Sequence, residues 1–320
     1  MNAAVVHSFK EPPRYTSFAD PAPAEGEKLV TVAAAGLHPI VKSLANGTHY
    51  GSTGELPFIP GVDGVGRLED GKRVFFGIAR SPYGPFSERA LASSWMNIEL
   101  PDGLDDVTAA GIANPGMSSW VALTSRAKFV AGESVLVLGA TGVAGQLAVQ
   151  NANRLGARRV IAAGRNPHAL EELKDLGADS VIALDQEHNA LVTAFRNELT
   201  QNGVDVVLDY LWGAPAESLL AAISHKGLRS VSSRIRFVQI GSSAGGEISL
   251  PAATLRSSGI ELLGSGFGSA AFDQIVEAVA EFFKMAATRP FHFQAKAVPL
   301  KDVEALWNIL ERGVRLVFQP

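Results

Sequence analysis

The distribution of apolar residues along the chain changes near residue 133. Before it, short apolar runs such as KLVTVAAAG and KRVFFGI are separated at close intervals by proline and glycine. This pattern is typical of β-strands joined by turns. After it, continuous apolar runs alternate with segments of helical periodicity. Runs that are apolar on both faces and alternate with helices predict a parallel sheet covered by helices on both sides.

This alternation of apolar runs and helical segments continues to about residue 266. After it, FDQIVEAVAEFFKMAA predicts an amphipathic helix, and FHFQAKAVPL and VRLVFQP return to β-strand around a helix from Asp302 to about Arg312. The segment 107–127 has helical spacing, which we expect to break at Asn114-Pro115-Gly116. The predicted parallel strands are SVLVLGA (134–140), RRVIAAG (158–164), SVIAL (180–184), VDVVLDYL (204–211), RFVQIG (236–241) and IELLGSG (260–266).

Composition narrows the class of protein. The 320 residues are 47% hydrophobic and 19% charged, with a net charge of −4, as expected for one large or two ordinary soluble globular domains. The sequence has no basic block and no apolar run of about 18 residues, so we expect neither nucleic-acid binding nor a membrane span. The absence of cysteine excludes disulfides, cysteine catalysis and thiolate metal sites. The N-terminus is predicted to be a first strand rather than a signal peptide, so the expected location is the cytoplasm.

The stretch VLVLGATGVAGQLAVQ carries three glycines in a G-x-x-G-x-x-G spacing between a strand and a helix. Small residues at this place let the backbone approach a pyrophosphate, and the helix dipole favours its negative charge. The alternative is that the glycines only permit close packing of the helix on the strand. The predicted cofactor contacts in the loop are Gly139, Thr141, Gly142, Val143 and Ala144.

The end of the second predicted strand bears on which dinucleotide binds. An acid there would accept hydrogen bonds from the ribose hydroxyls of NAD. Here the strand ends AAGRNP, with Gly164 near the expected place of the acid and Arg165 and Asn166 after it. A guanidinium pairs with a 2′-phosphate, and an asparagine can donate to it, so we predict NADPH. The alternative is that Arg165 stacks on adenine or faces water.

Several segments together resemble the medium-chain dehydrogenase/reductase superfamily, and among its branches the zinc-free quinone oxidoreductase-like enzymes. The resemblance covers essentially the whole chain and implies a Rossmann doubly wound domain at 113–287, inserted into a GroES-like, β-rich catalytic domain at 1–112 and 288–320. It also implies a homodimer joined through IELLGSG. The segments that carry it are LPFIPGVDGVG, GATGVAG, NPGMSSWVAL, DVVLDYLWG and FVQIGSSAG.

The resemblance also indicates whether the chain has a catalytic zinc site. The zinc ligands of metal-dependent members correspond to His38, Val62 and Asn114. Valine cannot bind zinc, asparagine is a poor ligand, and one histidine is not enough for a catalytic site, so no metal is predicted. GVDGVG is itself expected to be strand with a tight bend, because no helix follows it. Asp63 is then a structural acid.

One departure from the branch concerns the substrate pocket. The family segment N-x-x-D-x-Y-x-R-x-G reads HPIVKSLANG here, with Ser43 and Ala45 in place of its tyrosine and arginine. The loss leaves quinone reduction itself open. His49 and Tyr50, just downstream, are candidate replacements.

The predicted function is hydride transfer from NADPH to a quinone, enone or other activated carbonyl compound, without zinc. The candidate hydrogen-bond donors to the substrate are His38, Asn114 and Tyr50. Two alternatives stay open: a zinc-free alcohol dehydrogenase or carbonyl reductase using His38 in proton transfer, and a non-catalytic NADPH-binding protein. The resemblance places further cofactor contacts at Ser118 near the nicotinamide amide, at Ile240, Gly241, Ser242, Gly264, Ser265 and Gly266 along the nicotinamide, and at Tyr210 near the adenosine.

Overall fold

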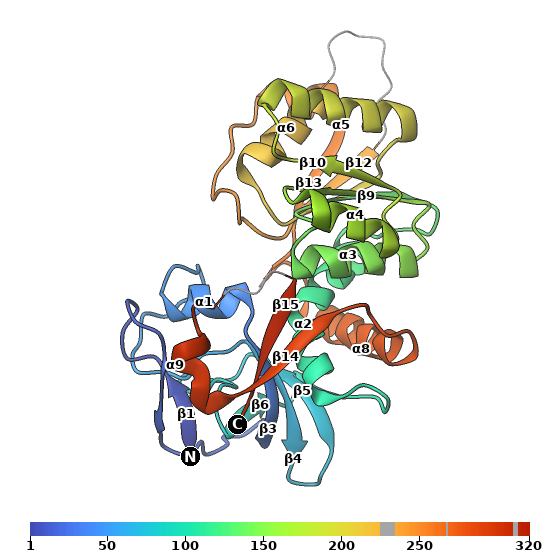
Figure 1. Ribbon diagram of the computed structural model, residues 1–320. Helices are drawn as coiled ribbons and strands as arrows, with labels where there is room; N and C mark the ends of the chain where they lie inside the picture. Colours follow the sequence, from blue (N-terminus) through green and yellow to red (C-terminus); the bar gives the residue numbers. More distant parts are fainter. Residues whose placement is uncertain (225–233, 267, 310–312) are drawn as a thin grey trace. The chain divides into compact units, whose positions relative to one another are not determined.

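The computed structural model describes residues 1–224, 234–266, 268–309 and 313–320 (Figure 1). The chain divides into two compact units. The central unit is Gly116–Ala278, and the terminal unit combines Met1–Pro115 with Val279–Pro320. One boundary falls inside helix α2 (Asp106–Val121) and the other inside helix α8 (Phe272–Thr288).

The central unit is built on a parallel sheet. Within its described residues, six strands pair in the order β10-β9-β8-β11-β12-β13, and every neighbouring pair is parallel. The strand order reverses between β8 and β11, which in doubly wound sheets marks the crevice where ligands bind. The strands are β8 (Ser134–Leu138), β9 (Arg159–Gly164), β10 (Ser180–Ala183), β11 (Val206–Asp209), β12 (Arg234–Gln239) and β13 (Gly259–Gly264).

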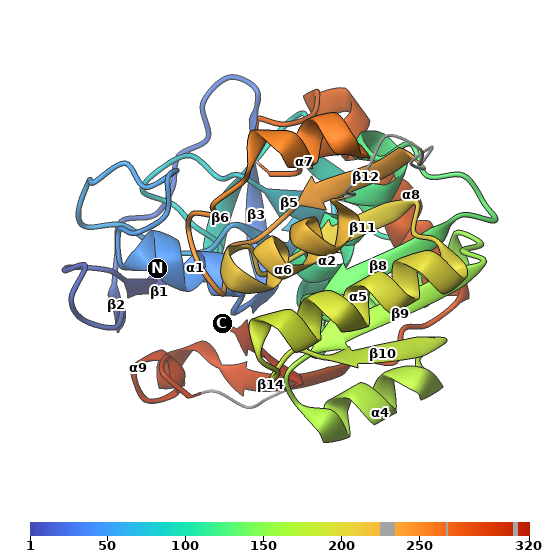
Figure 2. The same cartoon turned by 90° about the horizontal axis from the view of Figure 1, so that it is seen from above.

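Helices cover both faces of this sheet, as the sequence predicted. In β8, Val135 and Val137 face one apolar core, while Leu136 and Leu138 face the other. The first core is closed by α3 (Val143–Arg154) and α4 (Pro167–Asp175). The second is closed by α5 (His188–Asn202) and α6 (Gly213–Ile223), which lie in front of the sheet in Figure 2. A short helix, α7 (Ala252–Ser257), precedes β13. This is the predicted Rossmann doubly wound architecture.

The predicted break at Asn114-Pro115-Gly116 does not occur. Helix α2 continues through Pro115, and a π-helical turn, η1 (Ala122–Arg126), follows it. Proline removes only one helix N–H, and its fixed φ is itself helical. The following turn gains a tertiary partner, because the Asn151 amide donates to the Gly116 carbonyl oxygen at 2.9 Å. Packing and this hydrogen bond outweigh the local tendency of proline to end a helix.

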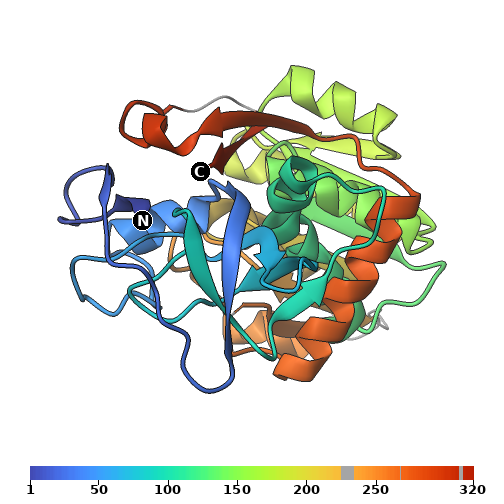
Figure 3. The same ribbon diagram turned by 90° about the horizontal axis from the view of Figure 1, so that it is seen from below.

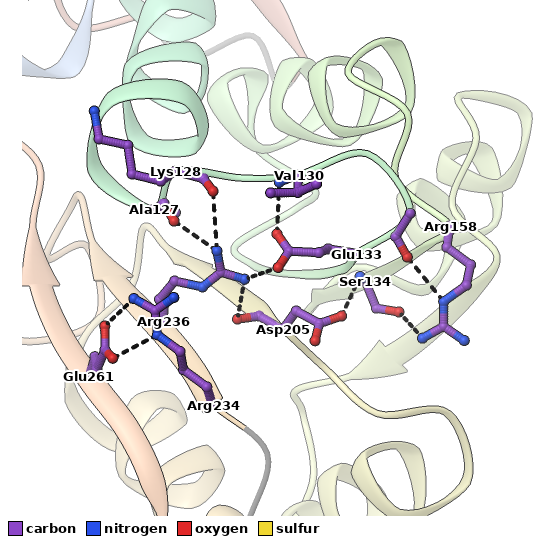
Figure 4. Close-up of polar contacts among 11 residues, drawn as sticks. Ala127, Lys128, Val130, Glu133, Ser134, Arg158, Asp205, Arg234, Arg236 and Glu261 are labelled. Atoms are coloured by element: carbon purple, nitrogen blue, oxygen red, sulfur yellow. Dashed lines mark hydrogen bonds and ion pairs between the residues drawn. The ribbon is translucent and has the colours of Figure 1, made fainter.

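A polar network joins the amino ends of the central strands (Figure 4). The guanidinium of Arg236 donates to the Ala127 carbonyl oxygen at 2.8 Å and pairs with Glu133 Oε1 at 2.5 Å. Asp205 accepts a hydrogen bond from the Ser134 backbone N–H at 2.8 Å. The side chain of Arg236 is only 4% exposed. This buried guanidinium and Asp205 therefore hold Glu133 and Ser134, at the start of β8.

The terminal unit is rich in β-strand. Its larger sheet has the order β14-β15-β3-β4-β5-β7, with β6 paired to β3, among the described residues. Both chain ends lie in this unit and close together (Figure 3). Its strands are β1 (Asn2–Val5), β2 (Arg14–Ser17), β3 (Glu27–Gly36), β4 (Asp63–Leu68), β5 (Arg73–Gly77), β6 (Arg89–Ser93), β7 (Asn97–Glu99), β14 (Gln294–Pro299) and β15 (Val314–Gln319), and its other helices are α1 (Pro39–Ala45), η2 (Leu300–Asp302) and α9 (Val303–Leu306).

Two sequence predictions in this unit have clear outcomes. The helix expected from Asp302 to about Arg312 is shorter, since α9 ends at Leu306; residues 310–312 lie outside the described residues. Within GVDGVG, residues 63–66 lie in strand β4, as predicted, while Gly61 and Val62 precede the strand and Val62 is at a bend. A Cβ at Gly66 would stand 2.4 Å from the Thr31 carbonyl oxygen, so this glycine permits the close approach of two backbones. In the parts of the chain that the structure describes, no helix has the length and apolarity needed to cross a membrane.

Candidate functional site

The three glycines after β8 have different structural reasons. Gly139 has a φ of +87°, a conformation that favours glycine. A Cβ on Gly145 would lie 2.3 Å from the Gly139 carbonyl oxygen and 2.5 Å from Ala140 Cα. Both residues are therefore glycine because the fold requires it.

Gly142 is different. Its φ of −81° and ψ of 162° suit any residue. A Cβ there would meet only the Gly139 carbonyl oxygen, at 3.6 Å, among the described atoms within 4 Å. Gly142 is also exposed. Neither the backbone conformation nor the packing within the described chain requires glycine at this position. A ligand that approached the backbone closely would require it.

The loop ends at the N-terminus of α3, where Gly142 is the N-cap residue and has no side chain to cap the helix. The first N–H groups of an α-helix have no intrahelical acceptor. The N–H groups of Val143 and Ala144 therefore face the loop, and the helix dipole favours an anion there. Of the predicted loop contacts, the Gly142 N–H is already engaged, because it donates to the Gly139 carbonyl oxygen at 3.2 Å.

The end of β9 carries the residues predicted to choose the dinucleotide. Gly164 is buried beside Thr141 of the loop. Arg165 is exposed and makes no hydrogen bond or ion pair within the described residues. Asn166 is the N-cap of α4, and its Oδ1 accepts from the Ala169 N–H at 3.2 Å. The guanidinium is thus available for an anionic ligand, while the Asn166 side chain is partly committed to the helix.

The segment after β11 contacts the glycine loop, and the segments after β12 and β13 follow it in turn along the same edge of the sheet. An added Cβ on Gly139 would stand 3.3 Å from Tyr210 Cβ, and one on Gly241 would stand 2.9 Å from the Tyr210 carbonyl oxygen. The Ser265 N–H donates to the Gln239 carbonyl oxygen at 2.8 Å, which places the 264–266 segment beside 240–242. The structure therefore brings together the residues predicted along the cofactor from four different strands.

Tyr210 and Ser118 are joined directly. Their hydroxyl oxygens lie 3.0 Å apart. Burial raises the pKa of Tyr210 to about 12, against the opposing hydrogen bonds from Ser118 and Ser119, so the phenol stays neutral at physiological pH. The side chain of Tyr210 therefore lies beside Ser118, the residue predicted near the nicotinamide amide. The predicted contact of Tyr210 with the adenosine stays a prediction.

One acid at this edge was not singled out from the sequence. Asp209 ends β11 and is fully buried. Its Oδ1 accepts from the N–H groups of Leu211, at 2.8 Å, and Trp212, at 3.0 Å. These bonds hold a turn in which Trp212 has a φ of 54°, unusual for a residue with a side chain. The available signal was an acid inside VVLDYL, a run otherwise apolar on both faces.

Asp209 makes a pH-dependent prediction. Burial raises the pKa of Asp209 to about 6 from its ordinary 3.8, against the two N–H bonds that lower it. The folded chain therefore holds this proton more tightly than the unfolded chain, and the contribution of Asp209 to stability falls as pH rises from about 4 to about 6. The wild type loses this contribution as the pH rises, whereas Asp209→Asn has no such contribution to lose. We therefore expect the free energy of unfolding of Asp209→Asn, minus that of the wild type, to increase by about 2 kcal/mol between pH 4 and pH 7. Urea unfolding at several pH values measures the difference, and a constant difference would contradict the assignment.

The terminal unit contains a buried polar cluster of His38, Asp63 and Arg315. His38 Nε2 lies 3.3 Å from Asp63 Oδ1, and the two side chains are 0% and 3% exposed. Arg315 Nη1 donates to the Leu37 carbonyl oxygen at 2.7 Å. Burial lowers the pKa of His38 although Asp63 and the Ala110 carbonyl favour its protonation, and the charge of Arg315 lowers it further. Burial also lowers the pKa of Arg315 to about 10, against the opposing charge of Asp63, so the guanidinium remains charged at neutral pH.

This cluster changes what can be expected of His38. The imidazole is fully enclosed, so a substrate could touch it only after its cover is displaced. Asp63, predicted to be a structural acid, is its partner, and the pairing of Arg315 with this region was not foreseen. Val62, at the position of a zinc ligand in the resemblance, lies in the apolar core of the terminal unit. The described residues contain no group of three or more His, Cys, Asp or Glu side chains able to hold a metal ion.

The other two predicted donors lie on different elements. Asn114 is half-buried in the middle of α2. Tyr50 follows α1, is 74% exposed, and stacks on His49 with ring centroids 4.2 Å apart. Their roles toward a substrate stay predictions.

Comparison with known proteins extends these observations. The family model described as zinc-binding dehydrogenase matches residues 143–284. The probable NADPH-dependent quinone reductase tdiC of Emericella nidulans is 28% identical over the full length of both chains. The quinone oxidoreductase of Pongo abelii is 30% identical over 222 residues, which cover 66% of each chain.

Solved structures agree with the sequence comparisons. The quinone oxidoreductase from Thermus thermophilus, described with its NADPH complex, is 27% identical, covers 100% of both chains and has a TM-score of 0.81. A mycobacterial quinone oxidoreductase has a TM-score of 0.85 over 100% of both chains at 21% identity, a likeness of fold. With the sheet order and the glycine loop described above, these similarities show that the chain belongs to the medium-chain dehydrogenase/reductase superfamily, in its quinone oxidoreductase-like branch.

Proposed function

We propose that this chain is an NADPH-dependent oxidoreductase that reduces a quinone, an enone or another activated carbonyl compound. The observation that carries the proposal is Gly142, an exposed glycine whose missing side chain serves no purpose within the described protein. A backbone left bare at the uncapped N-terminus of α3 suits a pyrophosphate. Relatives named as NADPH-dependent or solved with NADPH support the choice of dinucleotide.

The central unit offers the groups that would hold the dinucleotide. The N–H groups of Val143 and Ala144 would donate to the pyrophosphate, and the Arg165 guanidinium would pair with the 2′-phosphate. The Asp209 bonds hold the turn that carries Tyr210 beside the loop. When bound, NADPH supplies a hydride to an electrophilic carbon.

For the acceptor, the protein must supply orientation and hydrogen-bond donors. A conjugated acceptor spreads its negative charge onto an enolate or phenolate oxygen, so one or two donors are enough to stabilise it. His38, Asn114 and Tyr50 remain the proposed donors. Tyr50 is the most exposed of them, while His38 requires its cover to move.

Fluorescence titration of NADPH and NADH tests the cofactor. We expect NADPH to bind the wild type more tightly, and Arg165→Ala to weaken NADPH by about tenfold while changing NADH little, because a charge-assisted bond to phosphate is lost. Arg234→Ala, which removes the same charge at the amino end of β12, is the matched control and is expected to leave both affinities unchanged. Equal binding of the two dinucleotides by the wild type would sink the assignment.

A parallel assay of acceptors tests the reaction. Oxidation of NADPH by a quinone or a simple enone, without added metal, is the expected result. Turnover of a primary alcohol with NADP⁺ that depends on added metal would favour an alcohol dehydrogenase. Tight NADPH binding without turnover on a broad panel would favour a non-catalytic binding protein.

Two broader expectations belong to the same proposal. Strand β13 is an edge of the parallel sheet in the described residues and exposes Leu262, which is consistent with a homodimer joined along it. Light scattering of the purified chain would test this, and a monomer at micromolar concentration would contradict it. The cytoplasm remains the proposed location, to be checked by fractionating cells that produce the chain.

A further inference from the structure

Gly164 has an unusual reason to be glycine. It is the last residue of β9, pairs in register with Ala183, and its carbonyl oxygen accepts from the Leu184 N–H at 2.8 Å. It is absent from the glycines with positive φ, so its backbone would accept any residue. The obstacle is a single side chain: an added Cβ would stand 2.4 Å from Cγ2, 3.0 Å from Oγ1 and 3.2 Å from Cβ of Thr141.

Thr141 cannot easily move away from Gly164. The two residues before it, Gly139 and Ala140, both donate their N–H groups to the Ala163 carbonyl oxygen at 2.9 Å. These bonds hold the loop against the end of β9, immediately before Gly164. A side chain at 164 would therefore have to displace either the Thr141 side chain or the loop itself, and the loop carries the proposed pyrophosphate contacts.

We propose that Thr141 is a specificity-determining residue for the dinucleotide. The proposal rests on the NADPH-dependent function above. A protein that prefers NAD places a carboxylate at the end of this strand to accept the ribose hydroxyls, and that carboxylate would repel a 2′-phosphate. The Thr141 side chain fills the space in which such an acid would begin. Position 164 is thereby restricted to glycine, and the neighbouring exposed Arg165 is left to bind the 2′-phosphate.

This arrangement makes positions 141 and 164 interdependent. With alanine at 141, the nearest atom of that residue to a new Cβ on 164 would be its own Cβ, at 3.2 Å. A shift of a few tenths of an ångström relieves such a contact, whereas the 2.4 Å overlap with Cγ2 requires a rearrangement. An acid at 164 should therefore become functional only when Thr141 is also shortened.

The first experiment measures packing without any ligand. Thermal unfolding is compared for the wild type, Gly164→Ala, Thr141→Ala and the double variant. We expect Gly164→Ala to lower the unfolding midpoint by about 4 °C, Thr141→Ala to change it little, and the double variant to recover most of the loss. Thr141→Ser, which keeps the hydroxyl but removes the nearest methyl, should recover part of it. Additive effects would overturn the proposal, because they would show that Thr141 does not exclude the side chain.

The second experiment measures the ratio of the NADH and NADPH dissociation constants. Gly164→Asp alone is expected to bind both dinucleotides poorly, since its Cβ displaces the loop. Gly164→Asp with Thr141→Ala is expected to shift the ratio toward NADH by about tenfold or more, because the new carboxylate gains ribose bonds and repels the 2′-phosphate. If Gly164→Asp alone produces the same shift, or if the double variant produces none, the proposal fails.

The wild-type titration separates the two possible failures. A wild type that binds neither dinucleotide removes the proposed function, and the specificity role of Thr141 falls with it. A wild type that binds NADPH, combined with unshifted ratios in the double variant, leaves the function standing and overturns only the role of Thr141.

Discussion

Substituting Gly142 by alanine is expected to weaken NADPH binding by about tenfold or more and to lower the free energy of unfolding by no more than about 1 kcal/mol. The added methyl meets no described protein atom closer than 3.6 Å, so the fold accepts it. It would stand where the backbone must come close to the pyrophosphate. Fluorescence titration measures the affinity, and urea unfolding measures the stability.

Gly145→Ala is the matched control, because the same methyl is added three residues further along. Here it would stand 2.3 Å from the Gly139 carbonyl oxygen, and we expect a loss of about 3 kcal/mol in the free energy of unfolding. The two variants should thus separate ligand approach from helix packing. Unchanged NADPH affinity in Gly142→Ala would remove the observation on which the proposed function rests.

Substituting Arg236 by methionine is expected to destabilise the protein by about 3 kcal/mol, because it removes a buried cation from the partly buried carboxylate of Glu133 and the carbonyl oxygen of Ala127. Methionine keeps most of the apolar stem and removes the guanidinium. The carboxylate of Glu133 and the carbonyl oxygen of Ala127 then lose the donor that Figure 4 shows between them. Urea unfolding should show a lower midpoint with an unchanged slope.

Arg234 provides the control on the same strand. Its guanidinium pairs with Glu261 through two short bonds, but the two side chains are 64% and 45% exposed. Exposed ion pairs contribute little, because water solvates both charges when the pair is broken. Arg234→Met should therefore leave the midpoint almost unchanged. Similar losses in the two variants would mean that burial does not decide the effect.

Much of the central unit could be predicted from the sequence because its signals are local. SVLVLGA and the runs after it are apolar on both faces and too short for a typical helix, which together favour strands between two helical layers. Short elements lacked such a signal: α1 and α7 have seven and six residues, too few to show a helical period. The break expected at Pro115 was wrong, because tertiary packing there outweighs the local preference of proline.

The candidate site divides in the same way. Glycine spacing indicated the loop from the sequence, but the different reasons for Gly142 and Gly145 depend on which atoms surround each of them. The close approach of Thr141 to Gly164 and the contact of His38 with Asp63 join different segments of the chain, so no local pattern reveals them. Asp209 was visible as an acid in an apolar run, but its role became apparent only with the turn that it holds.

The strand pairing of the terminal unit has a consequence for synthesis on the ribosome. Residues of β3 pair with β15 at the opposite end of the chain, in the register Val317 with Gly36. The sheet of the central unit is contiguous in sequence and is complete once β13 has emerged. We therefore expect the central unit to fold while β3 still lacks its C-terminal neighbour, because contacts between distant residues form late. Until translation ends, Ala35 and Gly36 at the end of β3 would lack this neighbour, although residues 27–31 of the same strand can already pair with β6, and a chain truncated before β14 would leave that end unpaired permanently.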